Sequence, residues 1–231
     1  MIRDIFIDLD NTILDFDAGE AVALSTAMRK HGIEPTREVL ERYHVINKAL
    51  WEQLEEGLVT RDRLRTERFA RLFSELSLDA DPELVEQDYA DMLSHQHVFM
   101  PGAEELLQEL KAQGYRLYIA SNGTASTQWQ RIREAGIEGY FCHIFISEEL
   151  GANKPDPRFF ELAAEAIEDY DSEKAVIIGD SLSSDIRGGI AAGIHTCLYV
   201  PEGRQLPVRE DVVPEHVVRR LSEVPGLLIK M

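Results

Sequence analysis

Two aspartates separated by one residue follow an apolar run near the start of the chain. Asp8 and Asp10 come directly after residues 5–7, which are Ile, Phe and Ile. Such a run is typical of a buried parallel strand, and ligands gather beyond the carboxyl ends of these strands. Two unpaired carboxylates about 4 Å apart repel by roughly 4 kcal/mol at an effective dielectric near 20. The pair therefore indicates a cation, a shared proton or a reaction that uses both groups, although an ordinary helix N-cap would also place acids here.

Polar groups also follow the next two apolar runs that resemble strands. Ser121 and Asn122 end the first of them, and a hydroxyl beside backbone N–H groups and a helix start could seat a phosphate. The same letters also form an ordinary turn. Lys154 precedes Pro155, which favours an extended backbone at the lysine. This lysine could pair with a carboxylate and a phosphoryl oxygen, or it could be a solvated loop residue.

Two further aspartates follow a later apolar run, residues 176–178. Asp180 comes at the end of this expected strand, and Asp185 stands at the start of the next expected helix, where a simple N-cap is the alternative. With Asp8 and Asp10 they would form a cluster of hard oxygen donors. Such a cluster suits Mg²⁺, which binds a few carboxylates and keeps waters that a phosphate oxygen can displace.

The elements that must position these residues alternate between strand and helix. After the first strand, strands are expected at residues 115–120, 143–146, 175–178 and 196–200, with an edge strand near 217–218. Helices are expected at residues 104–113, 127–135, 157–167 and 185–192, with a short last helix. This order predicts an α/β fold: a Rossmann-like, three-layer core with a parallel sheet covered on both faces.

Residues 16–97 interrupt this alternation with helical periodicity alone. Helices are expected at residues 15–30, 37–56, 60–76 and 82–95, the last capped by Asp81. We therefore expect an all-helical cap domain at 16–97, inserted into an α/β core made of 1–15 and 98–231. One stretch of the insert is rich in arginine and is expected to form a solvated helix face, with one arginine reading the substrate as the alternative. These arginines are Arg61, Arg63, Arg65, Arg68 and Arg71.

The composition restricts the partners of the chain. Its 231 residues hold 24 Lys and Arg against 42 Asp and Glu, a net charge of −18. This balance argues against a nucleic-acid polymer or an anionic membrane as the main partner, and a phosphorylated substrate would need local positive charge. No apolar stretch is long enough to span a membrane. Cys142 and Cys197 are expected to be small buried residues, and a cytoplasmic location is expected.

Taken together, these motifs resemble the haloacid dehalogenase-like hydrolase superfamily. The resemblance covers the whole chain and includes the insert, which is similar to the cap domain of the family. Residues 8–16 and 184–189 are most similar to the YjjG-type pyrimidine 5′-nucleotidase branch, whereas Leu198 and Val200 stand where that branch is expected to carry an aromatic residue and an asparagine. The matching motifs are Asp8-Leu9-Asp10-Asn11-Thr12, Ser121, Lys154-Pro155 and the segment from Gly179 to Asp185.

The resemblance implies a role for each matching residue. Asp8 would be the nucleophile that forms an aspartyl-phosphate, and Asp10 the general acid and then the general base. Lys154 would act in catalysis and in phosphate binding. The implied metal ligands for Mg²⁺ are Asp8, Asp10 (through its backbone carbonyl), Asp180 and Asp185. The implied substrate-binding residues are Thr12, Ser121, Asn122 and Lys154.

The implied activity is therefore Mg²⁺-dependent hydrolysis of a phosphomonoester, with a small phosphorylated metabolite such as a (pyrimidine) nucleoside monophosphate as the substrate. Phosphoglycolate and sugar-phosphate phosphatases share the same core and are the first alternative. A dehalogenase needs no metal and does not normally carry an acid at the position of Asp10. A receiver-type signalling module also clusters acids, a hydroxyl and a lysine around an aspartate that becomes phosphorylated, but receivers have about half this length and lack a helical insert after the first strand.

Overall fold

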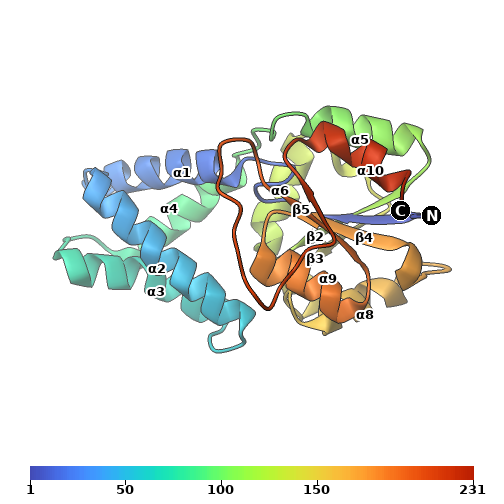
Figure 1. Ribbon diagram of the computed structural model, residues 1–231. Coiled ribbons are helices and arrows are strands. Elements are labelled where there is room, and N and C mark those ends of the chain that lie inside the picture. The colour runs from blue at the N-terminus through green and yellow to red at the C-terminus, as the bar shows by residue number, and fades with distance from the viewer. The chain divides into compact units, whose positions relative to one another are not determined.

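The computed structural model describes residues 1–231, which form two compact units (Figure 1). One unit contains Met1–Phe16 and His97–Met231, and the other contains Asp17–Gln96. The first is the α/β unit and the second is entirely helical. No helix in the chain combines the length and the apolar character that crossing a membrane requires.

The α/β unit is built on a six-stranded sheet in which every pairing is parallel. Ile7 of the first strand is in register with Ile119 and Ile178, so this strand lies between two neighbours. The central strands are buried on both faces, as expected for a parallel sheet. In the order in which they lie, the strands are β3 (His143–Ile146), β2 (Arg116–Ser121), β1 (Asp4–Ile7), β4 (Ala175–Gly179), β5 (His195–Tyr199) and β6 (His216–Val218).

Helices cover both faces of this sheet, which confirms the predicted three-layer α/β fold. Figure 1 shows α5 (Ala103–Ala112) and α10 (Val224–Leu228) on one face and α8 (Pro157–Glu165) and α9 (Arg187–Ala192) on the other. Side chains alternate along β1, so Ile5 and Ile7 pack with α5, whereas Phe6 packs with α8. The remaining helices are α6 (Ala125–Glu134) and α7 (Ser147–Leu150).

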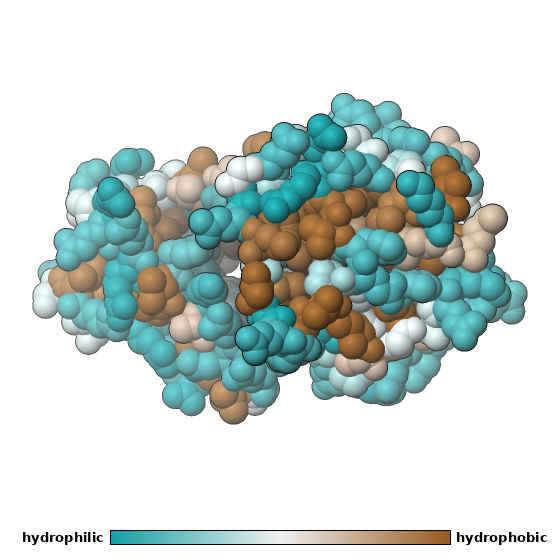
Figure 2. Space-filling view, viewed as in Figure 1, coloured by the Kyte–Doolittle hydropathy of each residue, from teal (hydrophilic) through white to brown (hydrophobic).

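The helical unit has its own aromatic core. Tyr43, Phe69 and Tyr89 are buried, with ring centroids 5.1 to 6.0 Å apart. Hydrophilic side chains cover much of the face of this unit seen in Figure 2, with apolar ones scattered among them. The helices, three of them capped at their N-termini by Thr36, Thr60 and Asp81, are α1 (Phe16–Lys30), α2 (Arg37–Glu55), α3 (Arg61–Leu76) and α4 (Pro82–Ser94).

Three details differ from the expectations. Arg68 is buried and pairs with Glu86, so it does not belong to a solvated helix face. Cys142 is exposed, because it precedes the first residue of β3, whereas Cys197 is buried. The turn before α9 begins earlier than expected, as one turn of π-helix at Leu182–Ile186, because the Ser181 carbonyl accepts from two amides four and five residues ahead.

Candidate active site

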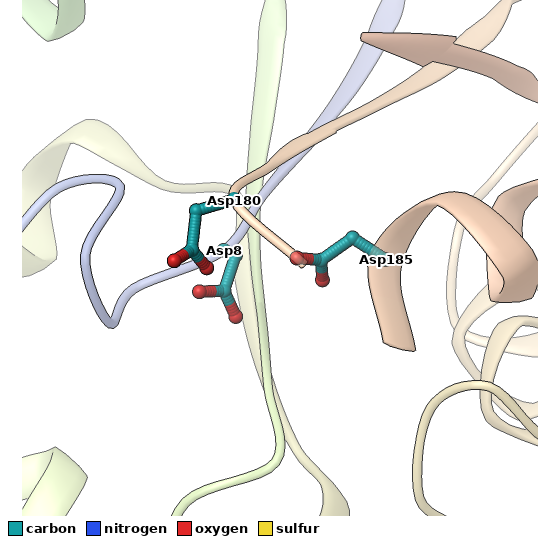
Figure 3. Close-up of side chains that lie close together, drawn as sticks. All are labelled: Asp8, Asp180 and Asp185. Carbon is teal, nitrogen blue, oxygen red and sulfur yellow. The ribbon is translucent and has the colours of Figure 1, made fainter. Parts of the chain in front are cut away.

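Three aspartates of the α/β unit gather at the carboxyl edge of the sheet. Asp8 follows β1, Asp180 follows β4, and Asp185 comes from the π-helical turn. One carboxylate oxygen from each lies within 4.8 Å of the other two. Figure 3 shows Asp8 and Asp180 side by side at the strand ends, with the carboxylate of Asp185 directed toward them.

A tight loop turns the chain directly after Asp8. The amides of Ile13 and Leu14 both donate to the Leu9 carbonyl, and Asn11 has a φ of 57°. Asparagine tolerates this left-handed conformation better than most residues. The loop takes Asp10 away from the group of three, so its side chain faces α6 instead, where Arg131 and Gln128 contact it.

Asp185 is held by its surroundings on both carboxylate oxygens. The amide of Ser181 lies 3.1 Å from Oδ2, and Lys154 Nζ lies 2.6 Å from Oδ1. A Cβ at Gly179 would come within 2.2 Å of Oδ2, so only glycine leaves room for this carboxylate. The glycine before Asp180 therefore has a steric role in building the site.

Lys154 is the central cation of the cluster. Its Nζ lies 2.7 Å from Asp8 Oδ1 and also donates to the Ala120 carbonyl, and its side chain is 1% exposed. Asn122 fixes the lysine backbone, because its side chain accepts from the Lys154 amide at 2.8 Å and donates to the Lys154 carbonyl at 2.7 Å. The peptide bond between Lys154 and Pro155 is cis.

Buried charge sets the electrostatics of the site. Burial raises the pKa of Asp8, and the nearby carboxylates Asp185, Asp10 and Asp180 add to this effect against the attraction of Lys154. Burial alone would lower the pKa of Lys154, but Asp185 and Asp8 hold it above its usual value. The single positive charge of Lys154 is shared between the carboxylates of Asp8 and Asp185. The negative charge of the cluster exceeds what the lysine supplies.

The donor set fits a small divalent cation. Carboxylate oxygens that converge on one point are the ligands that Mg²⁺ takes in proteins, and the cluster has charge left to neutralise. Asp8, Asp180 and Asp185 would contribute side chains to such an ion. The side chain of Asp10 does not belong to this group of three.

The predicted phosphate-binding residues occupy the same edge. Ser121 is the last residue of β2, and its Oγ accepts from the Gly123 amide at 3.1 Å. Thr12 has a buried hydroxyl without a hydrogen-bond partner. The first amide of α6, at Ala125, donates to the Glu148 carboxylate at 2.7 Å. The substrate-binding roles of Thr12, Ser121, Asn122 and Lys154 stay predictions.

Two residues at this site were missed by the sequence analysis. Gln128 and Arg131 lie three residues apart on α6, and both are buried. Gln128 Nε2 lies 2.7 Å from Asp10 Oδ2 and 2.8 Å from Ser121 Oγ. A glutamine and an arginine on the inward face of a helix could have been noticed as an i, i+3 pair, but nothing in the sequence names their partners.

The family model for haloacid dehalogenase-like hydrolases matches residues 2–193. The chain belongs to this family. The assignment confirms the resemblance inferred from the motifs and makes the chain a hydrolase of the haloacid dehalogenase-like type.

Three curated relatives of this haloacid dehalogenase-like hydrolase are similar to it over most of their length. The HAD-hydrolase YfnB of Bacillus subtilis is 38% identical over 98% of this chain and 95% of its own. A crystal structure of YfnB, described as bound to magnesium, matches with a TM-score of 0.91 over 98% of both chains. The pyrimidine 5′-nucleotidase PynA of Streptococcus pneumoniae is 40% identical over 85% of this chain and 83% of its own. The pyrimidine 5′-nucleotidase YjjG of Escherichia coli is 30% identical over 98% of this chain and 97% of its own.

Proposed function

We propose that the chain is a Mg²⁺-dependent phosphomonoester hydrolase that works through a phosphorylated Asp8. The observation that carries the proposal is the convergence of Asp8, Asp180 and Asp185 around the buried ammonium of Lys154. Phosphoryl transfer depends mainly on alignment and charge neutralisation, which this arrangement supplies. The magnesium-bound relative YfnB supports the choice of cation.

The proposed reaction has two displacement steps at phosphorus. In the first, a carboxylate oxygen of Asp8 attacks the phosphorus, the bond to the ester oxygen breaks, and the leaving oxygen takes a proton from the carboxyl group of Asp10. In the second, the Asp10 carboxylate takes a proton from water, whose oxygen attacks the phosphorus. The bond from phosphorus to Asp8 then breaks and releases inorganic phosphate, so both aspartates return to their first state.

The other residues would stabilise charge during these steps. Lys154 and the hydroxyl of Ser121 would bind phosphoryl oxygens, while Asp8, Asp180 and Asp185 would hold the metal. When bound, Mg²⁺ would neutralise charge on the phosphoryl oxygens and help align the phosphorus with Asp8. A dehalogenase would have no use for a carboxylate at Asp10, which favours phosphatase chemistry.

We infer that the substrate is a nucleoside monophosphate, with pyrimidine bases preferred. The support is the identity of 40% to PynA and of 30% to YjjG, both named pyrimidine 5′-nucleotidases. We further propose that residues 16–97 act as a cap that closes over the bound substrate and excludes bulk water during the reaction. Phosphoglycolate and sugar phosphates are the alternative substrates.

A substrate panel with two controls tests the proposal. The panel contains pyrimidine and purine nucleoside monophosphates, phosphoglycolate and sugar phosphates, and phosphate release is measured. We expect turnover that EDTA abolishes and Mg²⁺ restores, and no turnover by Asp8→Asn with its circular dichroism unchanged. Activity near wild type in Asp8→Asn would contradict the nucleophile. Turnover that EDTA does not reduce would contradict the proposed Mg²⁺ requirement. A higher turnover of a sugar phosphate than of the nucleoside monophosphates would contradict the proposed substrate class.

A further inference from the structure

Two buried side chains on α6 contact groups that the proposed reaction has to aim. Arg131 Nη1 donates to Asp10 Oδ1 and lies 2.9 Å from Gln128 Oε1. Gln128 Nε2 bridges Asp10 Oδ2 at 2.7 Å and Ser121 Oγ at 2.8 Å. The exposed fraction is 0% for Arg131 and 2% for Gln128. Burying an amide and a guanidinium is costly unless their partners are fixed, so these contacts define one geometry.

The contact from Gln128 determines which way the Ser121 hydroxyl donates. A serine oxygen has two acceptor sites and one proton. Both acceptor sites of Ser121 Oγ are used, by the Gln128 amide at 2.8 Å and by the Gly123 amide at 3.1 Å. The hydroxyl proton is therefore left to donate to another acceptor. In the proposed reaction that acceptor is a phosphoryl oxygen.

The same pair fixes the carboxylate of Asp10. One of its oxygens accepts from Arg131 and the other from Gln128, so the side chain is held on both oxygens. A general acid has to lie within hydrogen-bond reach of the leaving oxygen, and an error of about 1 Å in placement can cost roughly 10²-fold in rate. The exposed fraction of the Asp10 side chain is 27%, so the held carboxylate still reaches solvent.

The loop before α6 is shaped around Gln128. A Cβ at Gly123 would lie 2.4 Å from both Cδ and Nε2 of Gln128. No side chain larger than hydrogen fits at residue 123 unless Gln128 moves. Glycine at residue 123 therefore leaves the space that the Gln128 side chain occupies in this network.

We propose that Gln128 and Arg131 are positioning residues that align the Asp10 carboxyl group with the leaving oxygen and aim the Ser121 hydroxyl at the phosphoryl group. This inference rests on the proposed function. The proposed role predicts that the effect of a substitution depends on the leaving group of the substrate. An alkyl phosphate ester needs a proton on the departing oxygen, whereas p-nitrophenyl phosphate releases a stable anion that does not. A misplaced Asp10 therefore slows the first substrate more than the second.

The test compares kcat/KM for a nucleoside monophosphate and for p-nitrophenyl phosphate, because kcat/KM reports the step that forms phosphorylated Asp8. For Arg131→Met we expect a loss of ~10²-fold with the nucleotide and of less than ~10-fold with p-nitrophenyl phosphate. Arg131→Lys, which keeps the charge, should recover part of the loss. Gln128→Leu should show the same selective loss and should also weaken inhibition by inorganic phosphate, because the Ser121 proton is no longer aimed.

Arg133→Met is the matched control, since Arg133 is exposed on the same helix and undergoes the same chemical change. Its kinetics should equal those of the wild type. If Arg131→Met fails to fold by circular dichroism, Gly123→Ala gives the same comparison by displacing Gln128. Equal losses with both substrates in an active enzyme would overturn the positioning role alone. A wild type that hydrolyses neither substrate would overturn the proposed function, and this inference with it.

Discussion

One buried lysine lies between two aspartates of this site and leaves part of their negative charge uncompensated. Lys154 Nζ lies 2.7 Å from Asp8 Oδ1 and 2.6 Å from Asp185 Oδ1. Removing one partner of a buried ion pair costs several kcal/mol, typically about 3–5, because the other charge is left uncompensated. One ammonium offsets two carboxylates only in part, and burial raises the pKa of Asp8. A divalent ion at the cluster would complete the compensation and favour the ionised form of Asp8, which the proposed reaction requires.

Gly179→Ala tests this arrangement without altering any charge. The new methyl group would lie 2.2 Å from Asp185 Oδ2 and would displace that carboxylate. We expect the affinity for Mg²⁺ to fall by ~10–100-fold, the usual range for losing support of a ligand. Activity titrated against Mg²⁺ measures the change.

The matched control is Gly139→Ala, because a Cβ at residue 139 meets nothing within 4 Å. Its Mg²⁺ titration should follow that of the wild type. An unchanged titration for Gly179→Ala as well would contradict a metal-binding role for Asp185.

The positions of some site residues could be predicted from the sequence, whereas the side-chain position of Asp10 could not. Asp8, Asp180, Asp185 and Lys154 could be placed together, because the carboxyl ends of parallel strands meet at one edge and each residue lies at the end of a strand or in the segment that follows one. The side chain of Asp10 could not be placed this way, since the loop after β1 turns it toward α6. The partners that hold it come from a helix face, and helical periodicity does not say what a face will contact.

At the scale of elements, a polar network holds the helical unit together inside its aromatic core. Glu20 of α1 accepts from Asn47 of α2 at 3.0 Å and from Tyr89 of α4 at 3.1 Å. Arg68 of α3 is paired with Glu86 of α4 at 2.6 Å. The network therefore links all four helices. Arg68 also lies over the Tyr89 ring, at 4.6 Å from its centroid.

The network makes the stability of the helical unit depend on pH through Glu20. Burial raises the pKa of Glu20, although hydrogen bonding from Tyr89 and the charge of Arg68 oppose this. An acid with a raised pKa in the folded state binds its proton more tightly there, so its stabilising contribution is full below the unfolded pKa. The contribution is lost as pH rises through the folded pKa.

We expect Glu20→Gln to remove this part of the pH dependence while keeping an oxygen that accepts both hydrogen bonds. The difference in free energy of unfolding between wild type and Glu20→Gln should shift in favour of the variant as pH rises above about 4.5. Denaturant unfolding of both proteins across this range measures it. A difference that stays constant with pH would show that Glu20 titrates as an exposed acid does.

The elements themselves were largely predictable. The strand at His143–Ile146 matched its predicted bounds, and Asp81 and Pro82 begin α4 as expected, because caps and apolar periodicity are local signals. The interior of the helical unit could not be predicted in the same way. An arginine-rich sequence looks the same whether all its arginines are solvated or one of them is buried. Arg68 is buried because Glu86 of the neighbouring helix meets it.

At the scale of the whole molecule, the net charge of −18 opposes the approach of an anionic substrate. Repulsion of this kind acts over long range and is screened by salt, with a Debye length of about 10 Å at 0.1 M. We expect kcat/KM for a nucleoside monophosphate to rise by less than ~10-fold between low and physiological ionic strength, at fixed free Mg²⁺. Steady-state kinetics in a neutral buffer measure this, and a steady fall with added salt would show that local positive charge dominates the encounter.

The most direct test of the account is to trap the phosphoryl group on the enzyme. Asp10→Asn should remove the base that activates water, while p-nitrophenyl phosphate needs no proton to release its leaving group. The Asp10→Asn variant is incubated with p-nitrophenyl phosphate and Mg²⁺, quenched with acid and analysed by peptide mass spectrometry. We expect one phosphoryl group on Asp8, and none in the double variant that also carries Asp8→Asn. A phosphoryl group on another residue, or the same label without Asp8, would contradict the account.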